Sequence, residues 1–288
     1  MSNLILYAIP AFIALMALEI VWAKKQMGHR EGALGTIGPP GDAIAGYELK
    51  DSAASLTMGL GSIIIGVGAA FLRVPFFAWL YDHRFVEVGS AWWAWGILLF
   101  AEDLCYYWFH RLHHEVRILW AAHVAHHSSQ HYNLSTALRQ PWLTPFTGPL
   151  FWAPLPLLGF SPAMVLIAQS WSLLYQFWLH TEAVGKLGPL EWVLNTPSHH
   201  RVHHGTNPEY LDKNHGGIFI LWDRLFGSFA KEVSRVTYGL TTNIRSFSPL
   251  HIATHELRAM GRDLSRCASL RDVFRAVLGR PGQFRPGP

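Results

Sequence analysis

Long apolar stretches alternate with short polar segments along the first 181 residues of the chain. Apolar residues fill positions 4–22 apart from Glu19 and positions 91–101, and the twenty residues at positions 53–72 are all uncharged. Positions 142–181 contain no Asp, Glu, Lys or Arg. Runs of about twenty apolar residues are long enough to cross a bilayer as helices. This pattern predicts an all-α integral membrane protein with about four transmembrane helices.

The longest of these stretches is unlike a single helix, because residues 142–181 include five prolines. The sequence GFSP at residues 159–162 is typical of a turn. We expect two shorter helices that form a hairpin and return near His180. In the stretch 53–72, four glycines favour close packing of the helix against a neighbour in lipid.

The composition agrees with a membrane protein. Half of the residues are hydrophobic and only 15% are charged, whereas soluble domains have about 25% charged residues. The two cysteines, Cys105 and Cys267, are far apart and form neither a disulfide framework nor a zinc-ribbon motif.

The charge distribution suggests an orientation and three regions. Lys24 and Lys25 follow the first apolar run, which places its C-terminal end in the cytoplasm by the positive-inside rule. Counting spans from there predicts a multi-pass protein with its active site on the cytoplasmic face. We expect an N-terminal transmembrane helix with a basic flank at 1–30, a membrane and cytosolic catalytic domain at 31–230, and a basic cytosolic tail at 231–288.

The tail carries ten Lys or Arg against four Asp or Glu. No nucleic-acid reading motif accompanies this charge, so we expect no nucleic-acid partner. Contact with anionic lipid headgroups is the preferred interpretation, with surface helices from Ser248 onward.

The chain holds 17 histidines, and many of them form three clusters. The sequences HRLHHE, HVAHH and HHRVHH each place imidazoles three or four residues apart, where they share a face of a helix. Neutral imidazole is the commonest protein metal ligand. The repeated spacing therefore predicts metal binding in a cytosolic helical cap.

The number of histidines favours two ions over one. A closed zinc site takes four ligands and usually includes cysteine, whereas about nine imidazoles shared between two ions leave a position open for oxygen or water. Spacing alone leaves Fe, Cu, Ni and Zn open, because imidazole binds all four.

The order of DLCYYWFHRLHHE, LWAAHVAHHSSQHYNLSTALRQ, QFWLHTE, NTPSHHRVHHG and WDRLFGSF resembles the fatty acid hydroxylase and sterol desaturase superfamily of membrane di-iron oxygenases. The run YNLSTALRQ is similar to its alkylglycerol monooxygenase branch. The resemblance implies a di-iron centre that uses O2. Its implied ligands are His110, His114, His123, His126, His127, His180, His200, His203 and His204. Some relatives have a further histidine at the position of Gln176.

Several polar residues near the clusters are candidates for supporting roles. Asp103 is the first candidate to orient a ligand imidazole, although it could instead reach headgroup water; Glu115, Glu182 and Asp212 follow. Asn133, Arg139 and Gln140 could line a substrate mouth or make ordinary loop contacts. His131 and His199 are assigned to outer-shell or surface positions.

Together with the resemblance, these features predict an O2-dependent lipid hydroxylase or desaturase, and the resemblance implies that the enzyme could cleave alkylglycerol ethers. The electron donor is tetrahydrobiopterin, as the resemblance implies, or a ferredoxin or cytochrome. Fatty acyl, ether lipid, sterol and carotenoid substrates all stay open, and the oligomeric state is not specified. The alternatives are a di-zinc lipid hydrolase and a metal transporter or storage protein.

Overall fold

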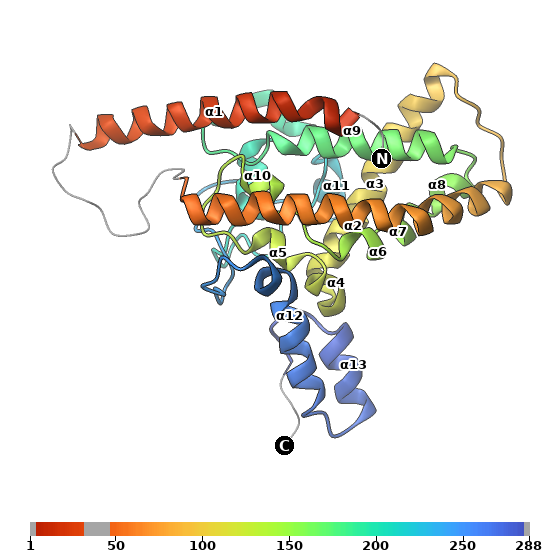
Figure 1. Cartoon of the computed structure of the whole chain (residues 1–288). Helices are drawn as coiled ribbons and strands as arrows, with labels where there is room; N and C mark the ends of the chain where they lie inside the picture. The colour runs from red at the N-terminus through yellow and green to blue at the C-terminus, as the bar shows by residue number, and fades with distance from the viewer. Residues whose placement is uncertain (1–3, 32–46, 285–288) are drawn as a thin grey trace.

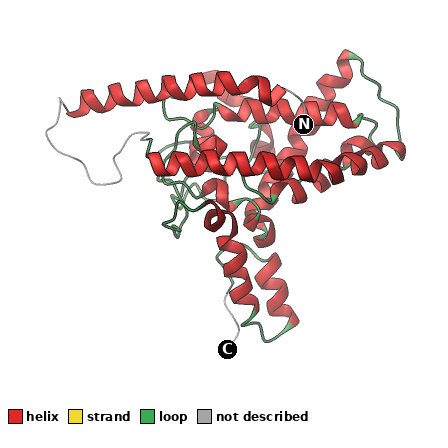
Figure 2. Ribbon diagram, in the orientation of Figure 1, coloured by secondary structure: helices red, strands yellow, loops and turns green. Residues whose placement is uncertain are grey.

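The computed structural model describes residues 4–31 and 47–284. Over these residues the chain is helical, without a named strand, which confirms the predicted all-α class (Figure 2). Two isolated β-bridges join loops, Leu194 with Phe219 and Gly205 with Tyr238. The expected boundary after residue 30 borders on residues 32–46, which lie outside the described residues.

Four long helices form the main body of the protein (Figure 1). They are α1 (Leu4–Glu31), α2 (Leu49–Asp82), α3 (Trp92–Glu115) and α9 (Pro162–Phe177). Two of them contain segments long and apolar enough to cross a membrane, Tyr7–Lys25 in α1 and Leu49–Asp82 in α2. Only 11% and 17% of their apolar windows are buried, unlike a core helix of a soluble protein. These exposed apolar surfaces indicate a membrane protein.

The stretch 142–158 forms short helical pieces rather than one span. These are α6 (Thr144–Thr147), α7 (Pro149–Trp152) and α8 (Pro154–Leu157), each with a proline in its first turn. Proline has no N–H to donate inside a helix but is well suited to the first turn. The turn expected at 159–162 is confirmed, because Gly159 has a φ of +90° and α9 begins at Pro162.

An apolar core fixes α3 against its neighbours. Buried Phe77 of α2, Leu98 of α3, Leu155 of α8 and Val165 of α9 belong to one cluster. On α3 this core includes Ala94, Leu98 and Phe109, and the same helix carries buried His110 and His114 near its C-terminal end.

The segments after α3 are short helices connected by loops. They are α4 (Arg117–Ala121), α5 (Val124–His127), η1 (Thr136–Leu138), η2 (Gly188–Trp192), α10 (Pro197–His203) and α11 (Leu221–Leu225). The histidine clusters lie on or beside α3, α5 and α10.

The C-terminal tail forms α12 (Pro249–Leu264) and α13 (Leu270–Leu278), which extend from the body in Figure 1. The tail is more than a surface element. Ile252 and Ala253 are buried in one cluster with Met58 of α2 and Ala125 of α5. Buried Arg117 also pairs with Glu256 and Asp263. These contacts hold α12 against the segments that carry histidines.

Candidate metal centre

The structure gathers nine buried histidines into two adjacent groups. Within each group, one ring nitrogen of every member lies within 4.8 Å of the others. The first group consists of His110, His114, His123, His127 and His203. The second group consists of His126, His180, His200 and His204. These are the nine ligands that the family resemblance implies.

The second and third clusters, HVAHH and HRVHH, each divide their histidines between the two groups. Residues four apart share a group, as His123 and His127 do, and His126 between them points into the second group. The third cluster does the same, with His200 and His204 in the second group and His203 in the first. A helix turns about 100° per residue, so positions i and i+4 are about 40° apart whereas i+3 and i+4 are about 100° apart. The spacing thus lets one short helix serve two sites.

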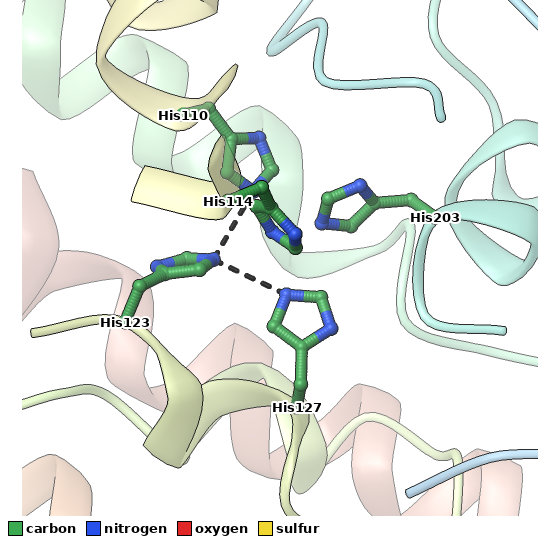
Figure 3. A group of neighbouring side chains, drawn as sticks. All are labelled: His110, His114, His123, His127 and His203. Atoms are coloured by element: carbon green, nitrogen blue, oxygen red, sulfur yellow. Dashed lines mark hydrogen bonds between the residues drawn. The ribbon is translucent and has the colours of Figure 1, made fainter. Parts of the chain in front are cut away.

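Figure 3 shows the first group, whose five rings come from three separate segments and point toward a common centre. His110 and His114 come from the end of α3. His123 precedes α5, which carries His127, and His203 ends α10. In the second group, His180 lies just after α9, and its ring faces His126 and His200.

Main-chain carbonyls fix the tautomer of four of these rings. His110 Nδ1 donates to the carbonyl of His215 at 2.8 Å, and His203 Nδ1 donates to that of Lys213 at 3.0 Å. In the second group, His126 and His180 donate to the carbonyls of Arg139 and Gln176 at 3.2 and 3.0 Å. A carbonyl only accepts, so each Nδ1 carries the proton and each Nε2 keeps a lone pair. Gln176, which stands where some relatives have a further histidine, therefore supports His180 through its main-chain carbonyl.

The Nε2 lone pairs in the second group fit a metal cation. His126 Nε2 and His180 Nε2 face each other at 3.1 Å, although both rings have their proton on Nδ1. His180 Nε2 also lies 3.0 Å from His200 Nε2. Two nitrogen ligands about 2.1 Å from one ion and at right angles lie about 3.0 Å apart.

The first group also fits a metal cation, because the Nε2 atoms of His114 and His203 are buried without a hydrogen-bond partner. Buried polar atoms are almost always paired. The donor set, the spacing and these unpaired atoms all fit bound metal ions.

Burial keeps the imidazoles neutral, as metal ligands must be. It lowers the pKa of His126 to about 4. It also holds the pKa values of His127, His200, His203 and His204 well below their ordinary value, and neighbouring imidazoles lower them further.

A buried ion pair anchors the second cluster to α2. Arg139 is 1% exposed and pairs with Asp51. It also donates to Ser55 Oγ and Ser128 Oγ at 3.1 Å each. Since its carbonyl accepts from His126, the expected mouth residue Arg139 acts here as an anchor for an imidazole of the second group.

Two further polar side chains, Glu19 and Arg201, connect the segments of the second group. Glu19 of α1 accepts from the N–H of Leu134 and from the hydroxyls of Tyr47 and Thr181. Arg201 of α10 donates to the carbonyl of Thr181, the residue after His180, at 3.0 Å. These contacts hold His180 near the other histidines of the second group.

Asp103 supports a loop and contacts no ligand imidazole. Its carboxylate accepts from the N–H groups of Ile218 and Phe219 at 2.6 and 3.0 Å, and from Trp222 Nε1 at 2.9 Å. Seven residues along a helix span about 10 Å, so Asp103 is too far from His110 to orient its ring.

The other candidate residues lie in packing or surface contacts. Buried Asn133 accepts from Ser135, and Gln140 donates to the carbonyl of Ala137 at 2.7 Å. Glu115 pairs with Arg111, Glu182 accepts from Tyr238, and Asp212 lies 3.8 Å from His114 Nδ1.

The remaining histidines near the clusters differ from the nine. His131 is half-buried in a loop, and its carbonyl accepts from Ser129 and Thr136. His199 is buried against Phe229. Of the two positions predicted for it, outer shell or surface, the surface position is wrong. His113 is fully buried and uses both ring nitrogens, on the Phe109 carbonyl and on Thr147 Oγ1.

The sequence reasoning missed His215, which is fully buried beside the first group. It stands alone in the sequence DKNHGG, without a second histidine at helical spacing. No pattern in the sequence pointed to it.

A cavity of about 620 Å³ reaches the histidines of both groups. Its walls include His114, His127, His203 and His204, together with the ring of Trp120. It is also lined by residues of α12, including His251, His255, Arg258 and Arg262. Asn133, Arg139 and Gln140 do not line this cavity.

Comparisons with known proteins agree with this site. Residues 95–228, which include all nine histidines, match the fatty acid hydroxylase family. The chain is 45% identical over 245 residues to alkylglycerol monooxygenase of Danio rerio, covering 83% of this chain and 51% of that protein. It is 38% identical over 282 residues to the Homo sapiens protein of the same name, covering 97% and 60%.

A more distant relative is ornithine lipid hydroxylase OlsE of Rhizobium tropici, 32% identical over 124 residues, covering 43% of this chain and 38% of that protein. No solved structure matches significantly. The chain spans about half the length of the alkylglycerol monooxygenases that it matches. The matched segment carries all nine clustered histidines. The chain belongs to the fatty acid hydroxylase and sterol desaturase superfamily and is similar to its alkylglycerol monooxygenase branch.

Proposed function

We propose that this chain is the catalytic part of a membrane di-iron monooxygenase that hydroxylates an ether lipid of the alkylglycerol class. The observation that carries the proposal is the pair of adjacent, carboxylate-free histidine groups in a chain similar to alkylglycerol monooxygenases. Dinuclear hydrolases normally have bridging carboxylates, and neither group of described residues contains one. The all-imidazole donor set therefore supports an oxygenase over a di-zinc hydrolase.

The nine histidines would hold two iron ions, which supply the activation of O2 when bound. The residues of the chain perform the other tasks. Carbonyls of Gln176, Arg139, Lys213 and His215 keep the Nε2 lone pairs available for ligation. Buried surroundings exclude water from the reacting groups.

The proposed reaction balances with two electrons from a donor. One oxygen atom of O2 enters the C–H bond beside the ether oxygen, and the other leaves as water after taking up two protons. The resulting hemiacetal breaks into an aldehyde and a glycerol. Orientation of the lipid is the task of the protein, because an unactivated C–H bond offers no charge for recognition.

The cavity supports a small-molecule donor. Its volume of about 620 Å³ is in the range of ligand sites, about 300–1,000 Å³, and too small for a protein. Its lining combines polar side chains such as Arg258 and Arg262 with apolar ones such as Trp120 and Leu211, and this mixture suits a flat reduced pterin better than a lipid tail. Among the three donors, tetrahydrobiopterin is thus favoured over a ferredoxin or cytochrome.

The proposed topology has about four spans and the histidines on the cytoplasmic face. The exposed apolar surfaces of α1 and α2 support membrane insertion. Lys24 and Lys25, exposed near the C-terminal end of α1, support a cytoplasmic position for that end.

The test is metal analysis and turnover of the intact protein purified without oxygen. We expect two irons, together with O2 uptake that requires both an alkylglycerol and a reduced pterin. Mass spectrometry should detect a fatty aldehyde. Bound zinc with oxygen-independent cleavage of a lipid ester would instead establish the hydrolase.

A further inference from the structure

His215 is buried in an unusual way for a histidine. Its side chain is fully inaccessible, and neither Nδ1 nor Nε2 has a hydrogen-bond partner. Leaving a buried polar group unpaired is energetically costly. A bound group that uses these nitrogens would remove this cost.

The ring of His215 lies against the first histidine group. Its centroid is 5.2 Å from that of His114, 5.6 Å from that of His203 and 5.7 Å from that of His110. Within the group, His110 lies 4.3 Å from His203 and 5.3 Å from His114. His215 is therefore only slightly farther from these three rings than they are from one another.

The main chain of His215 is held firmly in this place. Its N–H donates to Asp223 Oδ1 at 2.8 Å, and its carbonyl accepts from His110 at 2.8 Å. The next residue, Gly216, donates to Asp223 Oδ2 at 2.7 Å. The backbone is thus connected directly to a ligand of the first group.

Asp223 also lies next to the imidazole of His215. Oδ1 is 3.7 Å from Nδ1, slightly beyond hydrogen-bond distance, and both side chains are fully buried. Asp223 is therefore the nearest carboxylate on this side of the ring to which Nδ1–H could donate. An imidazole with a carboxylate behind it is a common arrangement of metal-bound histidine.

We propose that His215 is a tenth imidazole of the centre, with Nδ1–H on Asp223 and Nε2 as the sixth ligand of the first group. This inference rests on the proposed metal centre and extends it. With His215 included, the first group would offer six imidazoles, whereas the second group offers four. The second group would therefore leave more room for exogenous ligands.

His113 provides a matched comparison within the same part of the fold. It is also fully buried, and its ring lies 6.2 Å from that of His123. Both of its nitrogens have protein partners, so a metal ion is not needed to satisfy them. Only the loss of His215 should affect metal binding directly.

The test is titration of the metal-free intact protein with Co(II), read by equilibrium binding and by visible absorption. We expect two ions in the wild type. His215→Gln should weaken one of them by about tenfold or more and change the Co(II) absorption. His215→Glu, which restores a ligand of similar length, should recover the affinity with a shifted spectrum, and His113→Gln should retain both ions.

Wild-type affinity and absorption in His215→Gln would overturn the inference. Equal losses in His215→Gln and His113→Gln, or no recovery in His215→Glu, would also overturn it by showing a packing role. A wild-type protein that binds no Co(II) or Fe(II) would instead refute the metal centre itself, so the two failures are distinguishable.

Discussion

His126 donates its Nδ1–H to the carbonyl of Arg139 at 3.2 Å, while the Arg139 side chain pairs with Asp51 of α2. Arg139 thus joins an imidazole of the second group to α2. The position of His126 in the second group therefore depends on how α2 packs.

Replacing Arg139 with Ala should destabilise the protein by about 3–5 kcal/mol, because Asp51 would remain buried without its partner. Thermal unfolding in detergent measures this loss. Gln140→Ala is the control, since Gln140 only donates to the nearby Ala137 carbonyl, and it should cost less than about 1.5 kcal/mol. Similar stability of the two variants would contradict the anchoring role.

Replacing His126 or His203 with Ala should remove metal from different groups. His126 belongs to the second group and His203 to the first. We expect each single variant to keep about one of two irons, because loss of one ligand weakens its own ion most. Elemental analysis of the purified variants measures this, and a double variant should lose both. Full iron content in either single variant would rule out its ligand role.

Gly59→Ala should be destabilising because α2 packs closely on the loop that leads to Arg139. A Cβ at Gly59 would lie 2.7 Å from the carbonyl oxygen of Leu138, whereas one at Gly68 would meet no atom within 4 Å. We expect a cost of about 1–3 kcal/mol for Gly59→Ala. Gly68→Ala in the same helix should be neutral or slightly stabilising. Equal unfolding temperatures of the two variants would exclude the clash.

Replacing Glu19 with Ala should loosen the second group from α1. The N–H of Leu134 and the hydroxyls of Tyr47 and Thr181 would lose their common acceptor, at about 1–3 kcal/mol for a buried unpaired group. Thermal unfolding and metal affinity should both decline. The control is Leu18→Ala at a position that is 64% exposed, and it should leave metal affinity unchanged.

The apolar pattern predicted much of the helical framework, including the turn at Gly159 and the two helices able to cross a membrane. It did not predict that residues 142–158 divide into α6, α7 and α8, because apolar composition alone does not show where each proline starts a new helix. It also missed the burial of α12 against α2, which depends on contacts such as Ile252 with Met58 between distant parts of the chain.

The histidine spacing and the family resemblance identified the nine residues that gather in the structure. They did not assign them to groups, since that depends on the direction of each side chain around a short helix. Asp103 was expected near a ligand but supports the Ile218 loop, because its distance from His110 along α3 is fixed by the helical rise.

The sequence by itself determined the helical class, the apolar helices and the clusters of histidines that can bind metal, because these depend on composition and local spacing. Only the tertiary structure decided that His180 faces His126, that Arg139 anchors the second cluster and that His215 lies beside the first group. Those relationships join residues 13 to 105 positions apart, from His126 with Arg139 to His110 with His215. Such distances in sequence are closed only when the apolar core has fixed the helices in place.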